Sequence, residues 1–224
     1  YNIQHTVTPN NGMLEVKLEC IRPDMEIHYT TDGSEPTATS PLYEKIVPVK
    51  EALTLKGAIF AHGRQMGKTL ILPVRWNLAT AKPVLGTNPA EKLLTNGIRG
   101  SLKYSDFEWC SWADNDSVSF TIDLLKPEVL NTLILGCITN NGMAIHKPAS
   151  VKVEVSDDNS KFREAAMQSF TPKEIFREGN FIENLSLKLG GTQARYVRVT
   201  AKGPGVCPAS HVRPGQTSRI FFDE

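Results

Sequence analysis

Residues 26–37 read E-I-H-Y-T-T-D-G-S-E-P-T and constrain the fold more than any other stretch of the sequence. Apolar and polar residues alternate through the first six positions, which is the pattern of a strand with one buried face. Asp32-Gly33 then predicts a tight turn, because glycine accepts positive φ and aspartate tolerates the left-handed region. Pro36 fixes its own φ and has no N–H to donate, so it closes the turn. The stretch predicts an exposed turn in an all-β domain.

The same alternation recurs along most of the chain. Residues 13–20 read M-L-E-V-K-L-E-C and place their apolar side chains on one face. Residues 129–138 are more uniformly apolar, which indicates a central strand covered on both faces. One short helix is predicted over residues 172–178. Further strands are predicted over residues 53–60, 70–76, 117–124, 151–155, 185–189, 195–199 and 220–222. The fold class is therefore all-β, with a small immunoglobulin-like sandwich followed by a larger sandwich or jelly roll.

The domain boundary is expected at the start of residues 77–89, which contain two prolines and a glycine and show little periodicity. This gives two domains, residues 1–77 and 78–224. A chain of 224 residues with 40% hydrophobic residues is long and apolar enough for two cores. The way the sequence opens and closes leads us to expect a fragment of a longer protein, in which a missing signal peptide says nothing about export.

Charge and hydropathy exclude two classes of function. A formal net charge of +1 provides no concentrated basic field for a nucleic acid. No run of eighteen apolar residues is present, so no transmembrane helix is predicted.

The four cysteines point to no zinc motif, because none of them lies in C-x-x-C spacing. Cys20 ends an alternating run and is expected to be a buried thiol. Cys110 and Cys207 lie in loop-like sequence, and the sequence leaves open whether they form a disulfide.

Residues 63–69 (G-R-Q-M-G-K-T) superficially match a phosphate-binding loop. Such a loop needs four residues between its glycines, with a strand before it and a helix after it, whereas this segment has three and joins two predicted strands. A hairpin is the better interpretation.

Two sets of motifs resemble known families. Y-T-x-D-G-x-x-P-T at residues 29–37 resembles the turn of the C-terminal sandwich domain of chitobiase/β-hexosaminidase chains. Downstream, the order of motifs resembles the discoidin-type (F5/8 type C) jelly-roll domain across nearly all of residues 78–224. These motifs are L-T-N-G-I-R-G at 94–100, W-x-x-W at 109–112, F-T-I-D-L at 120–124, V-K-V-E-V-S-D-D at 151–158 and A-R-Y-V-R-V at 194–199.

This order of domains implies the C-terminal region of a family 20 β-hexosaminidase of gut Bacteroidetes, in which the discoidin-type domain resembles a carbohydrate-binding module. The parent enzyme would be exported, and its catalytic barrel would lie N-terminal to this chain as a partner domain. The chain itself is expected to be non-catalytic. Asp223-Glu224 matches the residue types of a catalytic Asp-Glu pair. Adjacent residues on a strand point their side chains to opposite faces, however, so these two carboxyl groups do not converge on one sugar.

A glycan site needs an aromatic face for the apolar side of a pyranose and fixed polar groups for its hydroxyls. Residues 103–112 supply such a mixture, from which we expect Tyr104 and Trp109 to contact the sugar. Trp109 is expected to be exposed and Trp112 to lie in the core. For Tyr104 and Phe107, packing within the loop is an equally good interpretation.

Polar contacts to the sugar are expected from His146, His211 and Arg213, which lie in loop-like segments, and Arg99 is a further candidate. The alternative for each is an ordinary surface or capping residue. Arg195 and Arg198 lie within a predicted strand and are expected to be structural.

The resemblance also implies a structural Ca²⁺ near the turn at residues 94–100. Asn96 stands where the family has an aspartate, so one negative charge is missing, and Glu224 would be the remaining acid. Because calcium prefers anionic oxygens, these two residues define only a candidate site.

Two other functions remain open. Both domains could brace the parent catalytic domain without binding a ligand, or the second domain could adhere to a protein or lipid surface. Asp106 and Glu108 beside Trp109 disfavour an anionic membrane.

Overall fold

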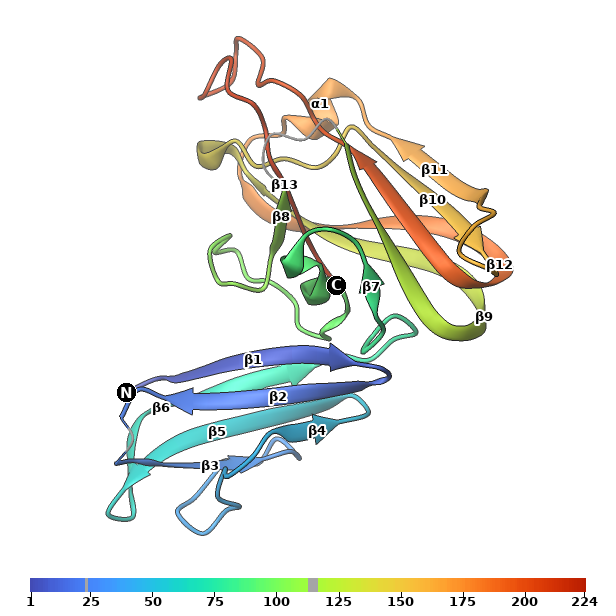
Figure 1. Cartoon of the computed structure of the whole chain (residues 1–224). Helices are drawn as coiled ribbons and strands as arrows, with labels where there is room; N and C mark the ends of the chain where they lie inside the picture. Colours follow the sequence, from blue (N-terminus) through green and yellow to red (C-terminus); the bar gives the residue numbers. More distant parts are fainter. Residues whose placement is uncertain (23, 113–116) are drawn as a thin grey trace. The chain divides into compact units, whose positions relative to one another are not determined.

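The computed structural model describes residues 1–22, 24–112 and 117–224. The chain forms two compact units (Figure 1). The first comprises Tyr1–Ala81 with Asn96–Ile98, and the second comprises Lys82–Thr95 with Arg99–Glu224. The assignment of 1–77 and 78–224 as functional domains stays a prediction. No helix in the described ranges has the length and apolar character needed to cross a membrane.

The first unit is a sandwich of two small antiparallel sheets. One sheet has the order β1-β2-β4 and the other β3-β5-β6. The strands are β1 (Ile3–Asn10), β2 (Met13–Cys20), β3 (Glu26–Thr30), β4 (Val47–Val49), β5 (Leu53–Ala61) and β6 (Arg64–Val74). Alternate residues of β2 are buried, as the period-2 pattern predicts. The small sandwich expected from the sequence is confirmed.

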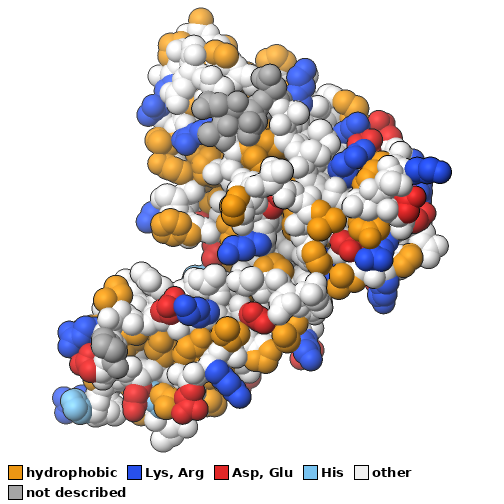
Figure 2. Space-filling view, in the orientation of Figure 1, with side chains coloured by type: hydrophobic (Ala, Val, Ile, Leu, Met, Phe, Trp, Pro, Cys, Tyr) orange, Lys and Arg blue, Asp and Glu red, His pale blue; other side chains and the backbone are white. Residues whose placement is uncertain are grey.

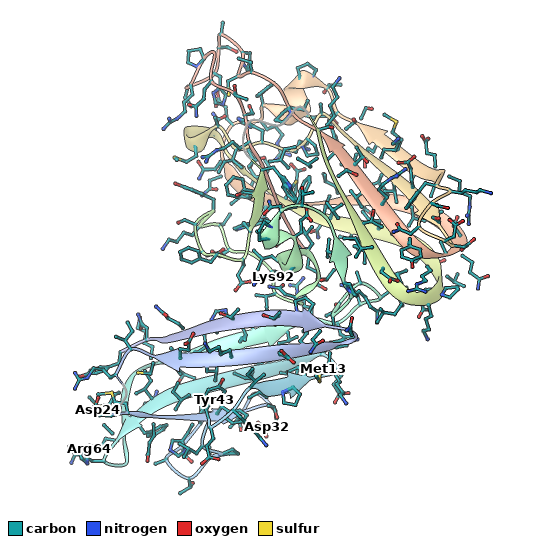
Figure 3. All side chains as sticks on the ribbon, viewed as in Figure 1. Met13, Asp24, Asp32, Tyr43, Arg64 and Lys92 are labelled. Atoms are coloured by element: carbon teal, nitrogen blue, oxygen red, sulfur yellow. The ribbon has the colours of Figure 1, made fainter. Side chains whose placement is uncertain are left out.

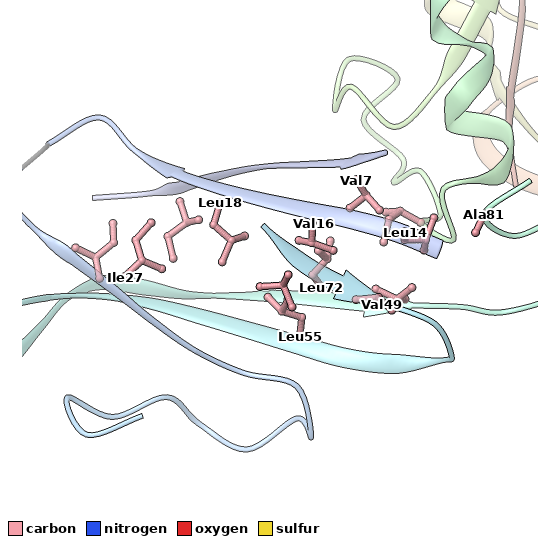
Figure 4. Packing of buried hydrophobic residues seen from close by; sticks show 14 residues of the cluster. Val7, Leu14, Val16, Leu18, Ile27, Val49, Leu55, Leu72 and Ala81 are labelled. Carbon is pink, nitrogen blue, oxygen red and sulfur yellow. The ribbon is translucent and has the colours of Figure 1, made fainter. Parts of the chain in front are cut away.

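Apolar side chains from both sheets meet in the core of this unit (Figure 4). Leu14, Val16 and Leu55 are fully buried there. Ile98 joins the same core, and the Arg75 N–H donates to the Gly97 carbonyl at 2.8 Å. These contacts explain why residues 96–98 belong to the first unit.

The turn at Asp32 is held by its own side chain. The Oδ1 atom of Asp32 accepts hydrogen bonds from the backbone N–H of Ser34 at 2.9 Å and from its hydroxyl at 2.6 Å. Gly33 adopts φ +79°, which an L side chain rarely tolerates. Asp32 and Tyr43 are labelled in Figure 3, and the Tyr43 hydroxyl accepts a hydrogen bond from the Leu18 N–H at 3.0 Å.

The second unit is built on one seven-stranded network in the order β11-β10-β12-β9-β13-β8, with β7 also pairing to β9. Its only elements other than strands, within the described ranges, are two short 3₁₀ helices and one turn of α-helix. The elements are β7 (Val84–Leu85), η1 (Pro89–Thr95), β8 (Cys110–Trp112), β9 (Ser117–Asn140), η2 (Asn141–Met143), β10 (Ser150–Ser156), β11 (Arg163–Ser169), α1 (Pro172–Ile175), β12 (Asn180–Lys202) and β13 (Ile220–Asp223).

The long strands β9 and β12 pair along almost their whole length and form an antiparallel ribbon. The pairing register shifts between Lys188 and Thr192 and again between Ala194 and Tyr196. Such bulges bend a strand, so one ribbon contributes to both layers of the domain. One half pairs with β10 and β7, and the other half pairs with β13. This arrangement confirms the predicted jelly-roll sandwich.

Several predicted strands differ from the observed ones in extent. The segments predicted separately at 117–124 and 129–138 form the single strand β9, and those at 185–189 and 195–199 form β12. The expectation that residues 129–138 are covered on both faces is wrong in part, because Val129 and Ile134 are more than half exposed. Strands β1, β4, β7, β8 and β11 were not predicted.

Two smaller predictions are confirmed. The helix α1 begins with a capping box, in which Thr171 and Glu174 each accept a hydrogen bond from the backbone of the other. The segment at 63–69 lies in the β5–β6 hairpin and is not followed by a helix.

A buried ion pair anchors the end of β13. The Arg99 Nε atom lies 3.2 Å from the carboxylate of Asp223, which has no exposed surface. The same carboxylate accepts the Gly100 N–H at 2.8 Å. The Arg99 guanidinium also donates to the Asn184 side chain at 2.6 Å and to the backbone carbonyl of Glu224. Arg99 therefore joins the loop after η1 to β12 and β13.

A glycine on β9 leaves room for this pair. A Cβ atom at Gly136 would lie 1.8 Å from the Asp223 carboxylate and 2.4 Å from the Arg99 guanidinium. Only glycine fits at this position while the ion pair is formed.

We expect Asp223→Asn to lower the free energy of unfolding of the second unit by about 3 kcal/mol, because it leaves the guanidinium of Arg99 without its counter-charge. Urea denaturation followed by tryptophan fluorescence measures this loss. Asp157→Asn is the matched control, since the Asp157–Arg163 pair is exposed and should cost less than about 1 kcal/mol. Equal losses in the two variants would contradict a structural role for the buried pair.

Candidate functional site

Four segments of the second unit gather at one end of its sandwich, and we call this region the loop end. They are residues 99–109, 140–149, 170–181 and 203–219. In Figure 1 the 203–219 segment (red) and α1 (orange) lie at this end. Contacts join the segments. Asn180 donates to the Leu102 carbonyl at 3.3 Å, and the Arg219 N–H donates to the Ala144 carbonyl at 2.9 Å.

Trp109 fills the interior of the 99–109 loop. It is only 5% exposed and packs with Ile138, Ile145 and Phe221. Its indole N–H donates to the Ser101 carbonyl at 3.0 Å, so the polar edge of the ring is satisfied inside the protein. The prediction that Trp109 is exposed is wrong, because the loop folds around the ring.

Trp112 lies in the core, as predicted. It is 8% exposed, stacks on Phe120 with ring centroids 6.1 Å apart, and meets Phe222 edge-on.

Phe107 is the aromatic side chain that this loop presents to solvent, with 88% of its surface exposed. Its backbone has φ +69°, an uncommon conformation for a bulky residue. The neighbouring Asp106 carboxylate accepts the backbone N–H groups of Ser101 at 2.5 Å and Glu108 at 3.0 Å. The loop backbone on either side of Phe107 is thus fixed by hydrogen bonds while its ring stays uncovered. The sequence left open whether Phe107 contacts a ligand or packs within the loop, and its exposure argues against packing.

Gly100 packs directly against the Trp109 ring, and a Cβ atom there would lie 2.2 Å from the indole. We expect Gly100→Ala to destabilise the second unit by about 1–3 kcal/mol through overpacking, and to shift Trp109 emission to longer wavelength as the ring is displaced.

Thermal melting and the emission maximum of the full chain measure both effects. Gly142→Ala is the control at the same end, because the nearest atom to its added methyl lies at 3.6 Å. It should change stability by less than about 0.5 kcal/mol. An unchanged emission maximum in Gly100→Ala would contradict the packing of Trp109 described above.

Tyr104 and Arg213 lie at the surface of the loop end. Tyr104 is half-buried and meets Phe221 edge-on at 6.0 Å, so part of its ring faces solvent. Arg213 is exposed, donates to the Gly142 carbonyl and reaches the Gln216 side chain at 3.3 Å. Their roles in binding a sugar stay predictions.

His146 and His211 face each other inside the protein. Their Nε2 atoms lie 3.1 Å apart, and His211 Nε2 also meets the side-chain oxygen of Asn141. His146 has no exposed surface and His211 is buried, so neither can touch a sugar in this conformation. The predicted contacts of these two residues to sugar hydroxyls do not fit the structure, because both rings point inward.

Cys207 lies beside this pair. One ligand atom from each of His146, Cys207 and His211 lies within 4.8 Å of the other two. All four cysteines of the chain are free thiols, including Cys110 and Cys207. Cys20 is half-buried rather than fully buried.

Burial and the neighbouring His211 lower the pKa of His146 from 6.5 to about 4. Between these two values the unfolded chain binds a proton at this residue and the folded chain does not. The free energy of unfolding should therefore fall as the pH drops from about 6.5 to about 4, by at most about 3 kcal/mol from this group. Denaturant unfolding at several pH values, in buffer with a chelator, measures the slope.

The comparison for this prediction is His146→Gln, which removes the titrating group. The difference in unfolding free energy between wild type and variant should shrink as the pH falls through this window. Curves that stay parallel from pH 7 to pH 4 would show that His146 does not titrate as described.

The residues expected for calcium fit the ion poorly. The side-chain oxygen of Asn96 accepts the Ile98 N–H at 2.9 Å, and Asn96 belongs to the first unit. In the second unit the Arg99 guanidinium already contacts Asp223 and the Glu224 carbonyl, and its positive charge disfavours a second cation there. Calcium binding stays a prediction, tested by the melting temperature of chelator-treated protein with and without added Ca²⁺.

Three other basic residues at the loop end and nearby are paired within the protein. Lys147 binds Glu183 at 2.8 Å, and Arg195 forms a two-point hydrogen bond with Asp123. Arg198 pairs with Glu154 at 3.0 Å. The prediction that Arg195 and Arg198 are structural is confirmed. On the face shown in Figure 2, positive and negative side chains are interspersed.

Comparison with family models gives two matches along the chain. Residues 9–70 match the chitobiase/beta-hexosaminidase C-terminal domain, and residues 79–212 match the F5/8 type C domain. Comparison with curated proteins found no match.

Solved structures similar to this chain include a Clostridium perfringens module, CpGH89CBM32-4, in complex with GlcNAc-α-1,4-galactose. It has 16% identity and a TM-score of 0.41, and the match covers 66% of this chain and 92% of the module. The C-terminal domain of a Bacteroides fragilis chitobiase matches with 14% identity, a TM-score of 0.31, and coverage of 57% and 76%. A Streptococcus pneumoniae fucose-binding module matches with 18% identity, a TM-score of 0.41, and coverage of 66% and 97%.

Proposed function

The chain belongs to the F5/8 type C domain family, and from that premise we propose that its second unit binds glycans through the loop end. In this proposal both units are non-catalytic parts of an exported chitobiase-type β-N-acetylhexosaminidase, whose catalytic domain precedes them. The order of the two matched domains supports the parent enzyme. Terminal N-acetylhexosamine or galactose is the proposed ligand.

The exposed ring of Phe107 is the observation that carries the proposal. Single exposed apolar side chains are common on protein surfaces, but Phe107 is an aromatic ring with 88% of its surface exposed on a loop held by hydrogen bonds. The αL backbone of Phe107 and the hydrogen bonds of Asp106 fix the loop from which the ring projects. Little conformational entropy is therefore lost when a sugar stacks on the ring. Phe107 therefore takes the role that the sequence assigned to Trp109.

Polar groups at the same end suit the hydroxyls of a sugar. The Arg213 guanidinium is exposed, and Tyr104 presents part of its ring. Lys103 on the same loop and Asn180 on the adjoining segment are also exposed. We propose that these donors orient the sugar while Phe107 supplies the contact area.

The expected affinity is low. Covering one aromatic face removes roughly 150 Å² from water, which is worth about 4 kcal/mol at about 25 cal/mol/Å² before the cost of association. This corresponds to dissociation constants in the millimolar range. Such a module acts by raising the local concentration of the attached enzyme on a multivalent glycan.

The two other functions receive less support. Adhesion to an anionic lipid surface would place Asp106 and Glu108, on either side of Phe107, against negative headgroups. A bracing role without ligand binding makes no use of the exposed Phe107 ring.

We expect Phe107→Ala to weaken sugar binding at least tenfold without changing the melting temperature, because the ring makes few contacts within the protein. NMR titration of the full chain with N-acetylglucosamine, N-acetylgalactosamine and galactose measures the binding. Ile134→Ala is the control, since Ile134 is 55% exposed on β9 and lies on a strand rather than in a loop.

Two results would count against the proposal. Absence of saturable shifts with every sugar up to high millimolar concentration would favour the bracing role. Equal binding by wild type and Phe107→Ala would place the ligand elsewhere on the domain.

A further inference from the structure

The buried group of His146, Cys207 and His211 is not explained by glycan binding. His146 precedes β10, while Cys207 and His211 lie four positions apart in the long 203–219 segment. His146 and Cys207 are buried, and His211 keeps 8% of its surface exposed. Three typical metal ligands from two separate segments thus meet within 4.8 Å inside the protein.

We propose that His146, Cys207 and His211 form a binding site for a transition-metal ion, with Zn²⁺ as the best-suited ion. Two imidazoles and one thiolate are the donor set that borderline-soft zinc prefers, whereas Ca²⁺ and Mg²⁺ prefer oxygen ligands. The proposal is independent of whether the domain binds a sugar.

The distances suit one shared ion. Zinc–nitrogen bonds of about 2.0–2.1 Å at a tetrahedral angle place two ligand nitrogens about 3.3 Å apart. The observed separation between the Nε2 atoms of His146 and His211 is 3.1 Å. The side-chain oxygen of Asn141 contacts the same atom of His211, so Asn141 would have to move away from that ring to serve as a fourth ligand. The thiolate must move inward to reach the ion.

His146 is prepared for this role by its surroundings. Its ring is fully buried and faces His211 and the backbone of Ile175. As a neutral imidazole, the ring has one free lone pair and needs to lose no proton to bind a metal ion.

Metal binding changes the protonation of His211 and Cys207. The backbone N–H of Arg213 donates to His211 Nδ1 at 2.9 Å, so Nε2 carries the proton of this neutral ring. Binding at Nε2 moves that proton to Nδ1 and breaks the hydrogen bond with Arg213. Cys207 ligates as a thiolate and releases its proton to solvent. Binding therefore replaces the hydrogen bonds of His211 with His146, Asn141 and Arg213 and that of Cys207 with Ser218, and releases one thiol proton, in exchange for bonds to the metal ion.

The sequence alone disfavoured zinc because no two cysteines lie in C-x-x-C spacing. That argument covers only ligands that are close along the chain. Here the fold brings His146 to the 203–219 segment through the pairing of Ile145 with Arg219. A bound ion would fix this long segment to residues 140–149 and so order the loop end.

Cobalt is the most informative probe, because a Co²⁺–thiolate bond gives a charge-transfer band in the near ultraviolet and a tetrahedral site gives strong visible bands. We expect the untagged, chelator-treated full chain to bind one Co²⁺ with these bands. Zn²⁺ in equal amount should remove them, and Ca²⁺ in excess should not. Zn²⁺ should also raise the melting temperature.

Variants identify the ligands. Cys207→Ser should lose the charge-transfer band and bind the ion at least tenfold more weakly. Cys110→Ser removes a different buried thiol and should keep the full spectrum. His211→Gln is a second ligand variant, and circular dichroism of each variant checks that the fold is retained.

The proposal is overturned if the wild-type chain takes up no stoichiometric Co²⁺ or Zn²⁺. It is equally overturned if Cys207→Ser retains the charge-transfer band, or if Cys110→Ser abolishes it. In those cases the three side chains form a hydrogen-bonded cluster only.

Discussion

The packing of the Trp109 indole against Gly100 determines what the loop end can present to a ligand. The ring occupies the interior of the 99–109 loop, and its N–H is satisfied by the Ser101 carbonyl. Phe107, two positions before Trp109, points into solvent from the same loop. The burial of Trp109 and the exposure of Phe107 thus belong to one loop conformation.

Hydrogen bonds and an ion pair also connect the loop end to the strands of the sandwich. Arg99 and Gly100 hold the Asp223 carboxylate of β13, and Arg99 reaches β12 through Asn184. A rigid base of this kind allows irregular loops to keep one conformation, which is the usual way in which binding residues are placed on β-sandwiches. The buried histidine pair and Cys207 provide a second connection among the same loops.

The fold was largely predictable because burial on one face of a strand leaves a period-2 pattern. Residues 13–20 were predicted as a strand and form β2 with the same limits. Strand β11 was missed because R-E-A-A-M-Q-S lies at the edge of its sheet and buries little. The continuity of β9 was missed because the pattern is interrupted near Leu125, where the ribbon bends with φ +70°.

The candidate site was less predictable, because exposure in a loop leaves no periodic signal. The sequence predicted that Trp109 is exposed and left Phe107 open, whereas Trp109 is buried and Phe107 is exposed, since aromatic residues two positions apart look alike without the path of the backbone. Gly100 was the available clue, because a glycine next to a loop can mark close packing of a large ring. The inward orientation of His146 and His211 depends on contacts between distant segments, which no local pattern records.

Stacking of a sugar on Phe107 is tested most directly by intermolecular nuclear Overhauser effects between the Phe107 ring and a bound sugar. At a saturating concentration of the sugar that binds, we expect contacts from the ring protons to the C–H protons on one face of the pyranose. Such contacts would establish that the sugar stacks on Phe107. A sugar that binds but contacts only other residues, with none to the Phe107 ring, would show that Phe107 is not the stacking platform.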